Sequence, residues 1–234
     1  MTLSRIDQLE QDLRAWLLRT PALSLASSLG AEDMVITDLI CRKNLPIRIF
    51  TLDTGRLPEA TYRLLDRVFE HYGRRIEVFW PALEDVEKLV REQGVNGFYH
   101  GLAARRACCG ARKVKPLARA LSGQQGWITG LRRDQSPTRS DLAAEAWDEG
   151  HGLVKYSPLL DWSREEVWSV LKEYRVPYNA LHDQGYASIG CAPCTRAVQP
   201  GEDERAGRWW WESSDSKECG LHVASEAETA IQES

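Results

Sequence analysis

Four cysteines of this chain are spaced so that they could bind a metal ion or an iron–sulfur cluster. Two are adjacent and two form a Cys-x-x-Cys motif further along the chain: Cys108, Cys109, Cys191 and Cys194. Four thiolates can hold either zinc or a cluster. An adjacent pair on a helix fits the paired knuckles of a zinc ribbon poorly, whereas a cubane offers separate irons to neighbouring sulfurs. The pattern favours a cluster, with zinc and a disulfide or redox pair as the alternatives.

A further cysteine, Cys219, lies near the C-terminus in the segment Lys217-Glu-Cys-Gly-Leu-His222. The segment is polar and lacks hydrophobic periodicity, so the thiol is expected at the surface. A thiolate is the nucleophilic form of cysteine, and Lys217 and His222 could both favour it. The alternative is a free cysteine in a tail without a function. The remaining cysteine, Cys41, has apolar neighbours on an expected helix, which indicates packing.

Basic residues gather in the same parts of the chain. They surround the cysteine pair, follow an expected strand and precede Cys219: Arg105, Arg106, Arg112, Lys113, Lys115, Arg132, Arg133, Arg139, Arg205 and Arg208. Such cations could simply balance the negative charge of a thiolate-bound cluster, or lie in solvent. Their proximity to an expected anion-binding turn favours a second role, the binding of an anionic substrate.

That turn is Ser27-Ser28-Leu29-Gly30, between the apolar run 23–26 and a helical run at 34–41. A strand, a Ser/Gly turn and a helix N-terminus together form an anion site, because free backbone N–H groups point toward the turn. An ordinary βα loop would use the same residues for its geometry, so the motif alone leaves both interpretations open.

Expected strands alternate with expected helices along most of the chain. The strands are predicted at 23–26, 47–52, 76–79, 127–130 and 154–156, and the helices at 4–19, 34–41, from 58, at 83–93 and at 167–174. This order predicts an α/β fold with a doubly wound, mainly parallel sheet. Ligands bind at the carboxyl ends of the strands in such folds. The turns after the first, second and fourth strands should therefore converge on one crevice.

Length and composition set the bounds. The chain has 234 residues and a formal net charge of -4, which argues against bulk nucleic-acid binding. It has no apolar run long enough to span a membrane, and acidic residues interrupt any signal-like run near the N-terminus. Periodicity fades after about residue 190. We expect a nucleotide-binding α/β domain with the cluster site at 1–194 and a C-terminal tail at 195–234, anchored by Trp209-Trp210-Trp211.

Taken together, these pieces resemble the sulfonucleotide reductases, and within them the cluster-containing assimilatory adenosine 5′-phosphosulfate (APS) reductases. The matching motifs are SSLGAED, LDTG, TGLRRDQS, the CC…CxxC set and KECGLH, which span residues 27–222. KECGLH combined with CC…CxxC is specific, whereas SSLG alone is weak. The related ATP pyrophosphatases carry SGGxDS, and the departure in this chain fits chemistry at sulfur instead of phosphorus.

The resemblance implies an adenine nucleotide α-hydrolase-like fold and a cytoplasmic enzyme that reduces APS to sulfite and AMP. It implies that Cys219 attacks the substrate sulfur, that thioredoxin reduces the resulting S-sulfonate, and that the four paired cysteines hold one 4Fe-4S cluster. No nucleic acid or membrane partner is expected, and a homo-oligomer stays open. The residues implied in substrate binding are Ser27, Ser28, Leu29, Gly30, Leu52, Asp53, Lys113, Arg132, Arg133, Arg139, Arg205, Arg208 and His222.

Three alternatives compete with this hypothesis. One is a reductase of the 3′-phosphorylated nucleotide PAPS, or one of dual specificity; PAPS enzymes generally lack the CC…CxxC set. Another is an adenylating sulfur-transfer enzyme of the pyrophosphatase (PP-loop) type, which would hydrolyse ATP to AMP and pyrophosphate. The third is a non-catalytic iron–sulfur sensor, which would leave the KECGLH segment unexplained.

Overall fold

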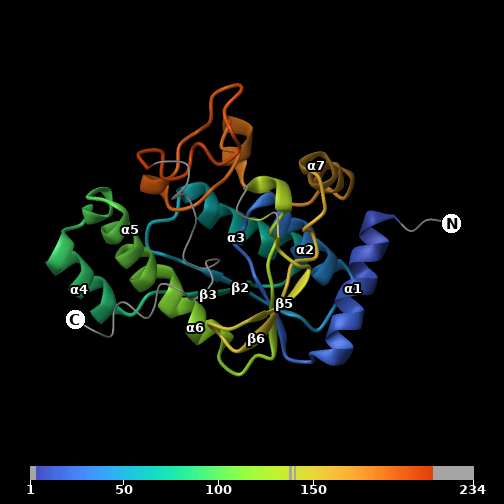
Figure 1. The fold of residues 1–234 in the computed structure, drawn as a ribbon. Helices are drawn as coiled ribbons and strands as arrows, with labels where there is room; N and C mark the ends of the chain where they lie inside the picture. The colour runs from blue at the N-terminus through green and yellow to red at the C-terminus, as the bar shows by residue number, and fades with distance from the viewer. Residues whose placement is uncertain (1–3, 137–138, 140, 213–234) are drawn as a thin grey trace.

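A six-stranded sheet forms the centre of the molecule (Figure 1). The computed structural model describes residues 4–136, 139 and 141–212. The strand order is β3-β2-β1-β4-β6-β5, in which only the edge strand β5 is antiparallel. The strands are β1 (Leu23–Ala26), β2 (Arg48–Leu52), β3 (Glu77–Phe79), β4 (Gly126–Ile128), β5 (Glu145–Asp148) and β6 (Leu153–Tyr156).

Within the described residues, seven α-helices connect and cover these strands. They are α1 (Arg5–Arg19), α2 (Ala31–Arg42), α3 (Glu59–Tyr72), α4 (Leu83–Gln93), α5 (Leu102–Cys109), α6 (Lys115–Leu121) and α7 (Arg164–Glu173). Their ends follow local chemistry. The Ser4 hydroxyl accepts from the Asp7 N–H at the start of α1, and Ser163 with Glu166 forms a capping box at α7. Gly73 ends α3 at a φ of 67°, which a glycine adopts without strain.

The two faces of the sheet bury different sets of apolar side chains. On one face, Leu25 and Ile49 pack in a large core with side chains from α1, α2, α3 and α7. On the other face, Phe50 and Trp127 pack with Leu117 of α6. Successive residues of a strand point to opposite faces, which explains why Ile49 and Phe50 enter different cores. The outcome is a layered α/β fold with helices on both faces, as the sequence predicted.

The adjacent cysteines lie where one helix changes its winding. Cys108 and Cys109 end α5, and a π-helical turn, η2 (Gly110–Val114), leads directly into α6. Single π-helical turns inside α-helices are frequent at functional sites. This turn carries Arg112 and Lys113.

Residues 195–212 follow the second cysteine pair and lie over the carboxyl-end edge of the sheet, in orange in Figure 1. Thr195 and Arg208 form an isolated antiparallel bridge, and the Trp209 side chain is only 1% exposed. The expected anchoring role of the tryptophan triplet is therefore met by Trp209. Trp210 is half exposed.

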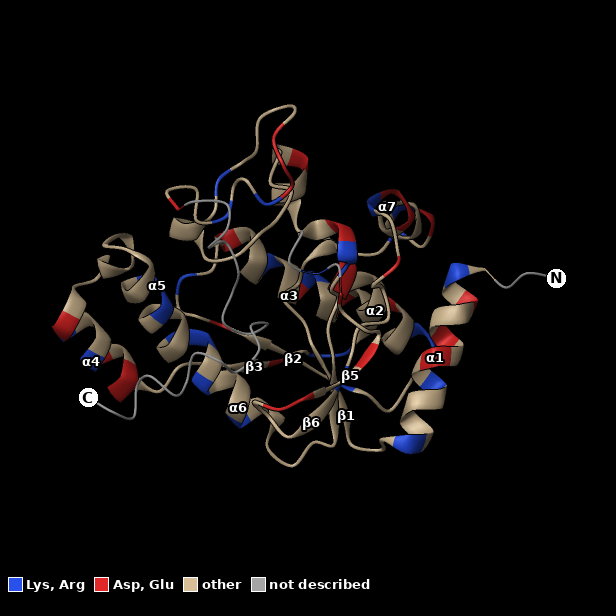
Figure 2. Cartoon of the chain, viewed as in Figure 1, with Lys and Arg blue, Asp and Glu red and all other residues tan. Residues whose placement is uncertain are grey.

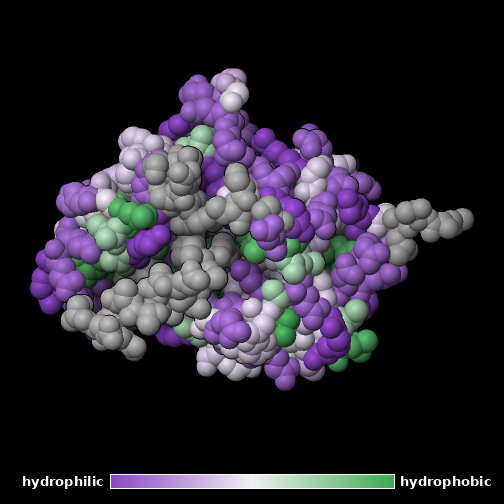
Figure 3. Space-filling view, in the orientation of Figure 1, coloured by the Kyte–Doolittle hydropathy of each residue, from purple (hydrophilic) through white to green (hydrophobic). Residues whose placement is uncertain are grey.

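The described residues on the face shown in Figure 3 are mostly hydrophilic, with apolar residues in scattered patches. Lysines and arginines lie along α5, α6 and the segment over the sheet edge in Figure 2. None of the helices in the described ranges is long and apolar enough to cross a membrane.

Candidate functional site

One pocket lies at the carboxyl ends of β1, β2 and β4, where the order of the strands reverses direction along the sheet. This is the place where open α/β sheets bind ligands. Turns after all three strands reach the pocket, so the predicted convergence is observed. Of the residues expected to bind substrate, those that line it are Ser27, Ser28, Gly30, Leu52, Lys113, Arg139, Arg205 and Arg208.

The turn after β1 is held in shape by a buried carboxylate, Asp33 in the first turn of α2. One Asp33 oxygen accepts from the Ser28 N–H and hydroxyl, each at 2.6 Å, and the other accepts from the Gly130 N–H at 2.9 Å. Burial raises the pKa of Asp33 to about 6, against the opposing effect of the Ser28 hydrogen bonds. Asp33 thus ties the turn after β1 to the turn after β4.

Two backbone features make this junction possible. Leu29 has a φ of 61°, a left-handed conformation that non-glycine residues rarely adopt outside functional turns. A Cβ atom on Gly130 would lie 2.4 Å from an Asp33 carboxylate oxygen, so only glycine allows the close approach. The Leu29 side chain is buried and does not line the pocket.

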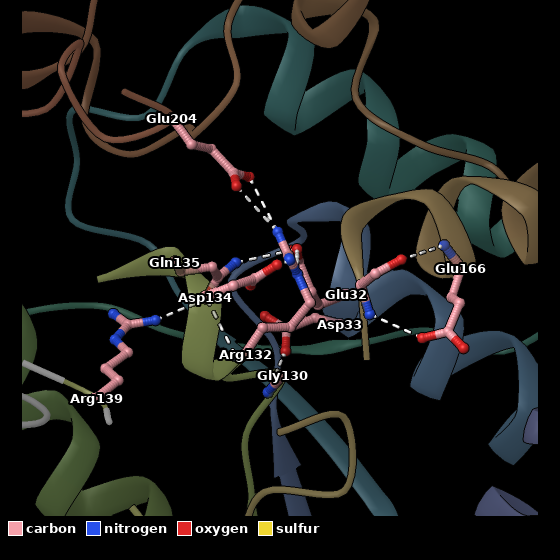
Figure 4. A network of polar contacts seen from close by, with 10 residues as sticks. Glu32, Asp33, Gly130, Arg132, Asp134, Gln135, Arg139, Glu166 and Glu204 are labelled. Atoms are coloured by element: carbon pink, nitrogen blue, oxygen red, sulfur yellow. Dashed lines mark hydrogen bonds and ion pairs between the residues drawn. The ribbon is translucent and has the colours of Figure 1, made fainter. Parts of the chain in front are cut away.

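Arg132 is the centre of an ion-pair network beside this junction (Figure 4). Its fully buried guanidinium pairs with Glu32 at 2.7 Å and with Glu204 at 3.0 Å, and it also contacts Asp134. Glu32 comes from α2 and Glu204 from the C-terminal segment, so Arg132 joins the two. Burial raises the pKa of Glu204, and the charge of Arg132 opposes that rise.

Arg139 is linked to this network through Gln135. Gln135 donates to Glu32 at 3.0 Å, and its side-chain oxygen accepts from Arg139 at 2.6 Å. Arg139 is 5% exposed and lines the pocket. Arg133 points elsewhere, since it pairs with Asp161 and donates to the Leu142 carbonyl.

The turn after β2 reaches the pocket through Leu52 and Thr54. Asp53 between them faces away, because its carboxylate accepts from Tyr62, Trp80 and the Gly55 N–H. Those hydrogen bonds fix the turn. Asp53 therefore supports this turn from outside the pocket wall.

The C-terminal segment supplies the opposite wall. Arg205, Arg208 and Trp209 line the pocket there. The Arg208 side chain is 7% exposed and packs so closely on Gly190 that a Cβ atom there would lie 2.4 Å from a guanidinium nitrogen. Its guanidinium carbon lies 4.6 Å from the centroid of the Trp209 ring.

The cysteines gather beside this wall. Cys194 is buried with Phe98 and Trp209, and Cys108 and Cys191 pack against the same cluster. Cys108, Cys109, Cys191 and Cys194 are all free thiols. Burial, together with the charge of the neighbouring Cys191, raises the pKa of the Cys194 thiol to about 12. The Thr54 hydroxyl lies 3.2 Å from the Cys191 sulfur, so the pocket and the cysteines share a wall.

Cationic side chains lie beside these four cysteines, which would suit a negatively charged group held by thiolates. No group of three or more His, Cys, Asp or Glu side chains within residues 4–136, 139 and 141–212 is arranged to hold one metal ion. The charges of Arg112 and Arg56 act on Cys108, and those of Lys113 and Arg208 act on Cys194. Cations on both sides would balance thiolate charge. Cys109 is buried and interacts with Arg105.

Two predicted residues, Cys219 and His222, lie outside the described residues. Sequence reasoning missed several that the structure brings to the pocket: Asp33, Thr129, Gln135, His182, Glu204 and Trp209. Thr129 and Gln135 lie within the TGLRRDQS motif and Asp33 within SSLGAED, so the motifs themselves carried a signal for these three. Glu204 lies in an acidic run with no motif.

Comparisons with known proteins agree with this geometry. The family model for the phosphoadenosine phosphosulfate reductase domain matches residues 22–197. An adenosine 5′-phosphosulfate reductase of Allochromatium vinosum is 58% identical over 201 residues, which cover 86% of this chain and 78% of the relative. A Burkholderia cepacia protein of the same name is 54% identical, with 88% of this chain and 82% of the relative covered.

A solved structure of phosphoadenylyl-sulfate (PAPS) reductase from Candida auris, in complex with phosphate, has a TM-score of 0.67 and 28% identity. The matched region covers 85% of this chain and 99% of the Candida auris chain. A Candida glabrata FMN adenylyltransferase shares only the fold, at 13% identity and a TM-score of 0.57 over 98% of this chain and 81% of that one. The family match over most of the chain, together with the pocket and the cysteines beside it, places the protein: it belongs to the phosphoadenosine phosphosulfate reductase family.

Proposed function

We propose that the protein reduces adenosine 5′-phosphosulfate to sulfite and AMP, in the assimilation of sulfate. The observation that carries this proposal is one pocket with two unlike walls. The wall at the strand ends has the turn type that binds nucleotide phosphates, and the opposite wall carries Lys113, Arg205 and Arg208. The names of the relatives from Allochromatium vinosum and Burkholderia cepacia support APS as the substrate.

The cations answer a physical difficulty of the reaction. The sulfur of a sulfate group is surrounded by oxygens that carry negative charge, so a thiolate that approaches it is repelled. Cations fixed around the sulfate offset that repulsion, and they do so best in a pocket that excludes water. Arg208 and Arg139 are both more than 90% buried at the pocket wall, which supports this role. We assign the adenosine to the wall at the strand ends, with Ser27, Ser28 and Leu52.

Cys219 is the proposed nucleophile. Its thiolate forms a bond to the substrate sulfur, the sulfur–oxygen bond to the phosphate breaks, and AMP leaves with that electron pair. A thiolate of the dithiol donor, thioredoxin, then attacks the Cys219 sulfur and displaces sulfite. The second donor thiol resolves the mixed disulfide, so the donor supplies both electrons and Cys219 is regenerated. Covalent capture thus divides a difficult reduction into two easier steps.

The length of chain between the pocket and Cys219 is compatible with this role. Trp209 lines the pocket. Glu212 is fixed three residues later, because its N–H donates to the Trp209 carbonyl at 2.8 Å. From residue 212 to residue 219, seven extended residues span at most about 24 Å. This length of chain would allow Cys219 to reach the wall that carries Arg205 and Arg208, as the proposal requires.

We further propose that Cys108, Cys109, Cys191 and Cys194 hold one 4Fe-4S cluster. The cluster would supply a fixed negative charge and bind α5 to the segment that begins at η6 (Ala192–Cys194). Lys113 acts on the charge of Cys194 and also lines the pocket, so it can respond to both the cluster and the sulfate. The expected domain arrangement, with residues 195–234 as a tail, and a cytoplasmic location belong to the same proposal.

The test is a sulfite and AMP assay on protein purified without oxygen, with reduced thioredoxin as donor. We expect sulfite from APS and much slower reaction with PAPS, because the 3′-phosphate needs a cation of its own. Equal or faster reaction with PAPS would support the alternative substrate, which the Candida auris structure makes the natural rival. Hydrolysis of ATP to AMP and pyrophosphate, with no sulfite from either nucleotide, would identify an adenylating enzyme instead.

A further inference from the structure

A buried ion pair joins α5 to the C-terminal segment. The Arg105 Nε donates to Glu212 Oε1 at 2.9 Å, and its Nη2 donates to Oε2 at 2.8 Å. The two side chains are only 1% and 6% exposed. A bidentate pair of this kind fixes both the distance and the orientation of its partners. Arg105 precedes the adjacent cysteines by one helical turn, and Glu212 follows Trp209 by three residues.

This pair acts on the same indole that contacts Arg208. The guanidinium carbons of Arg105 and Arg208 lie 4.5 and 4.6 Å from the Trp209 ring centroid. Trp209 has a φ of 41°, so its backbone is held in a strained, left-handed conformation. Its N–H donates to the Cys194 carbonyl at 3.1 Å, and its carbonyl accepts from Glu212 at 2.8 Å. Glu212 therefore holds the turn of Trp209 through its backbone and α5 through its side chain.

Charge gives the ion pair a role beyond attachment. The guanidinium groups of Arg105 and Arg208 share one ring, with that of Arg205 further out at 6.0 Å from the centroid, and their mutual repulsion is strong where water is excluded. The Glu212 carboxylate neutralises Arg105, so the ring can accept both. The positive charge of Arg208 stays unbalanced by a carboxylate, since none among the described residues pairs with it. Its polar contacts there are two long hydrogen bonds of 3.4 Å, to the Ser188 hydroxyl and the Ile189 carbonyl.

We propose that Glu212 is a positioning residue for the sulfate end of the pocket. Its ion pair with Arg105 holds the Trp209 indole in place, and the indole in turn presents the charged Arg208 guanidinium to the pocket. This inference rests on the proposed function, since it assumes that Arg208 faces the sulfate of the substrate. It adds a residue that does not line the pocket and lies in none of the sequence motifs.

The test compares the affinities of two ligands that differ only by the sulfate. Binding of APS and of AMP is measured by titration in a Cys219→Ser background, where no turnover of APS is expected. Glu212→Gln should weaken APS binding about tenfold or more and change AMP binding less than twofold. Glu212→Asp, which keeps the charge, should recover part of the loss. The matched control is Glu202→Gln, because Arg196–Glu202 is also bidentate, lies in the same segment and is exposed.

Folding is controlled by a second variant. Glu212→Gln leaves the Arg105 charge buried, which can destabilise the protein, whereas a buried ion pair replaced by apolar residues often leaves stability intact. The double variant Arg105→Met/Glu212→Leu keeps the net charge, and its iron content and Tm report folding. We expect it to fold, bind AMP normally and still bind APS weakly.

Several results would overturn the inference. One is an equal loss of AMP and APS affinity in Glu212→Gln, which would mean general damage to the pocket. Another is recovery of normal APS binding in the apolar double variant, which would mean that the ion pair only stabilises the fold. Failure of the proposed function looks different: wild-type protein with thioredoxin would then release no sulfite from APS, whatever residue stands at position 212.

Discussion

The two walls of the pocket are built in different ways. At the strand ends, backbone groups and small side chains are fixed by carboxylates that have several donors each: Asp33 accepts three hydrogen bonds, and so does Asp53. On the cysteine side, large cations are held by an indole, by close packing on a glycine and by long hydrogen bonds. The hydrogen-bonding groups of the first wall are largely paired with one another, whereas the second wall presents positive charge to the pocket.

That contrast separates recognition from reaction. A nucleotide is much the same before and after the reaction, so a rigid and satisfied wall serves it well. The sulfate changes charge and geometry as its sulfur is attacked, and only interactions that strengthen in the transition state accelerate the step. Substitutions at the first wall should therefore change nucleotide affinity, and those at the second should change the chemistry.

The largest effect is expected at the cysteine side. Cys194→Ser removes a proposed cluster ligand that is buried against Trp209, so iron and activity should be lost together. Wild-type protein purified anaerobically should be brown and contain about four irons per chain, by iron analysis and visible absorption. Cys41→Ser is the control, since Cys41 packs against the core on α2 and should keep its iron. Stoichiometric zinc with a colourless protein would refute the cluster.

Removal of a cation should come next. Arg208→Ala, Arg205→Ala or Lys113→Ala each deletes a charge at the pocket wall, and each should lower kcat/KM for APS by about tenfold or more. AMP should inhibit these variants nearly as well as it inhibits the wild type. Arg196→Ala, which alters an exposed pair in the same segment, is the control. Wild-type kinetics in all three variants would return these residues to an ordinary surface role.

A smaller, pH-dependent effect is expected at the nucleotide wall. Folding raises the pKa of Asp33 from 3.8 to about 6, mainly through burial. Between those two pH values the folded state therefore binds more protons than the unfolded state. Above pH 6, the ionised Asp33 lowers the free energy of unfolding by on the order of 3 kcal/mol. Its contribution to stability accordingly falls as the pH rises through this window.

Function should follow the opposite course. Ionised Asp33 accepts from Ser28 and Gly130, and a proton on the carboxyl displaces one of these donors. AMP affinity should therefore decline a few-fold as the pH falls from 7 to 5, beyond the change due to the AMP phosphate, which titrates near 6. Asp33→Asn should bind AMP more weakly at pH 7 and lack that additional decline. An identical pH profile in both proteins would show that Asp33 does not control the turn.

The fold was predictable because its elements carry strong local signals. The strand at 23–26 and the helix at 83–93 match the predicted bounds, and the sheet is mainly parallel as expected. Strand β5 was missed because it is an edge strand that exposes Glu145, Ala146 and Trp147, and so shows no alternation of apolar and polar residues. It pairs only with β6, in antiparallel register.

The site was predictable in its motifs but not in how its charges are used. Sequence alone counts Arg132 as a free cation, yet three carboxylates surround it, and two of them, Glu32 and Glu204, are 100 and 72 residues away in the sequence. Asp53 is a second example, with an anion in place of a cation. Its carboxylate is held by hydrogen bonds that turn it away from the pocket. Such pairing depends on tertiary contacts that no local pattern encodes. For Cys219 and His222, the assigned roles stay predictions.

The central claim is that Cys219 captures the sulfur of APS before any donor acts. Wild-type protein mixed with APS and no thioredoxin should release one equivalent of AMP in a single burst, and mass spectrometry of its peptides should place one sulfonate on Cys219. Cys219→Ser should keep its iron and bind APS, yet give neither adduct nor sulfite. An adduct on another cysteine, or normal turnover by Cys219→Ser, would contradict the mechanism.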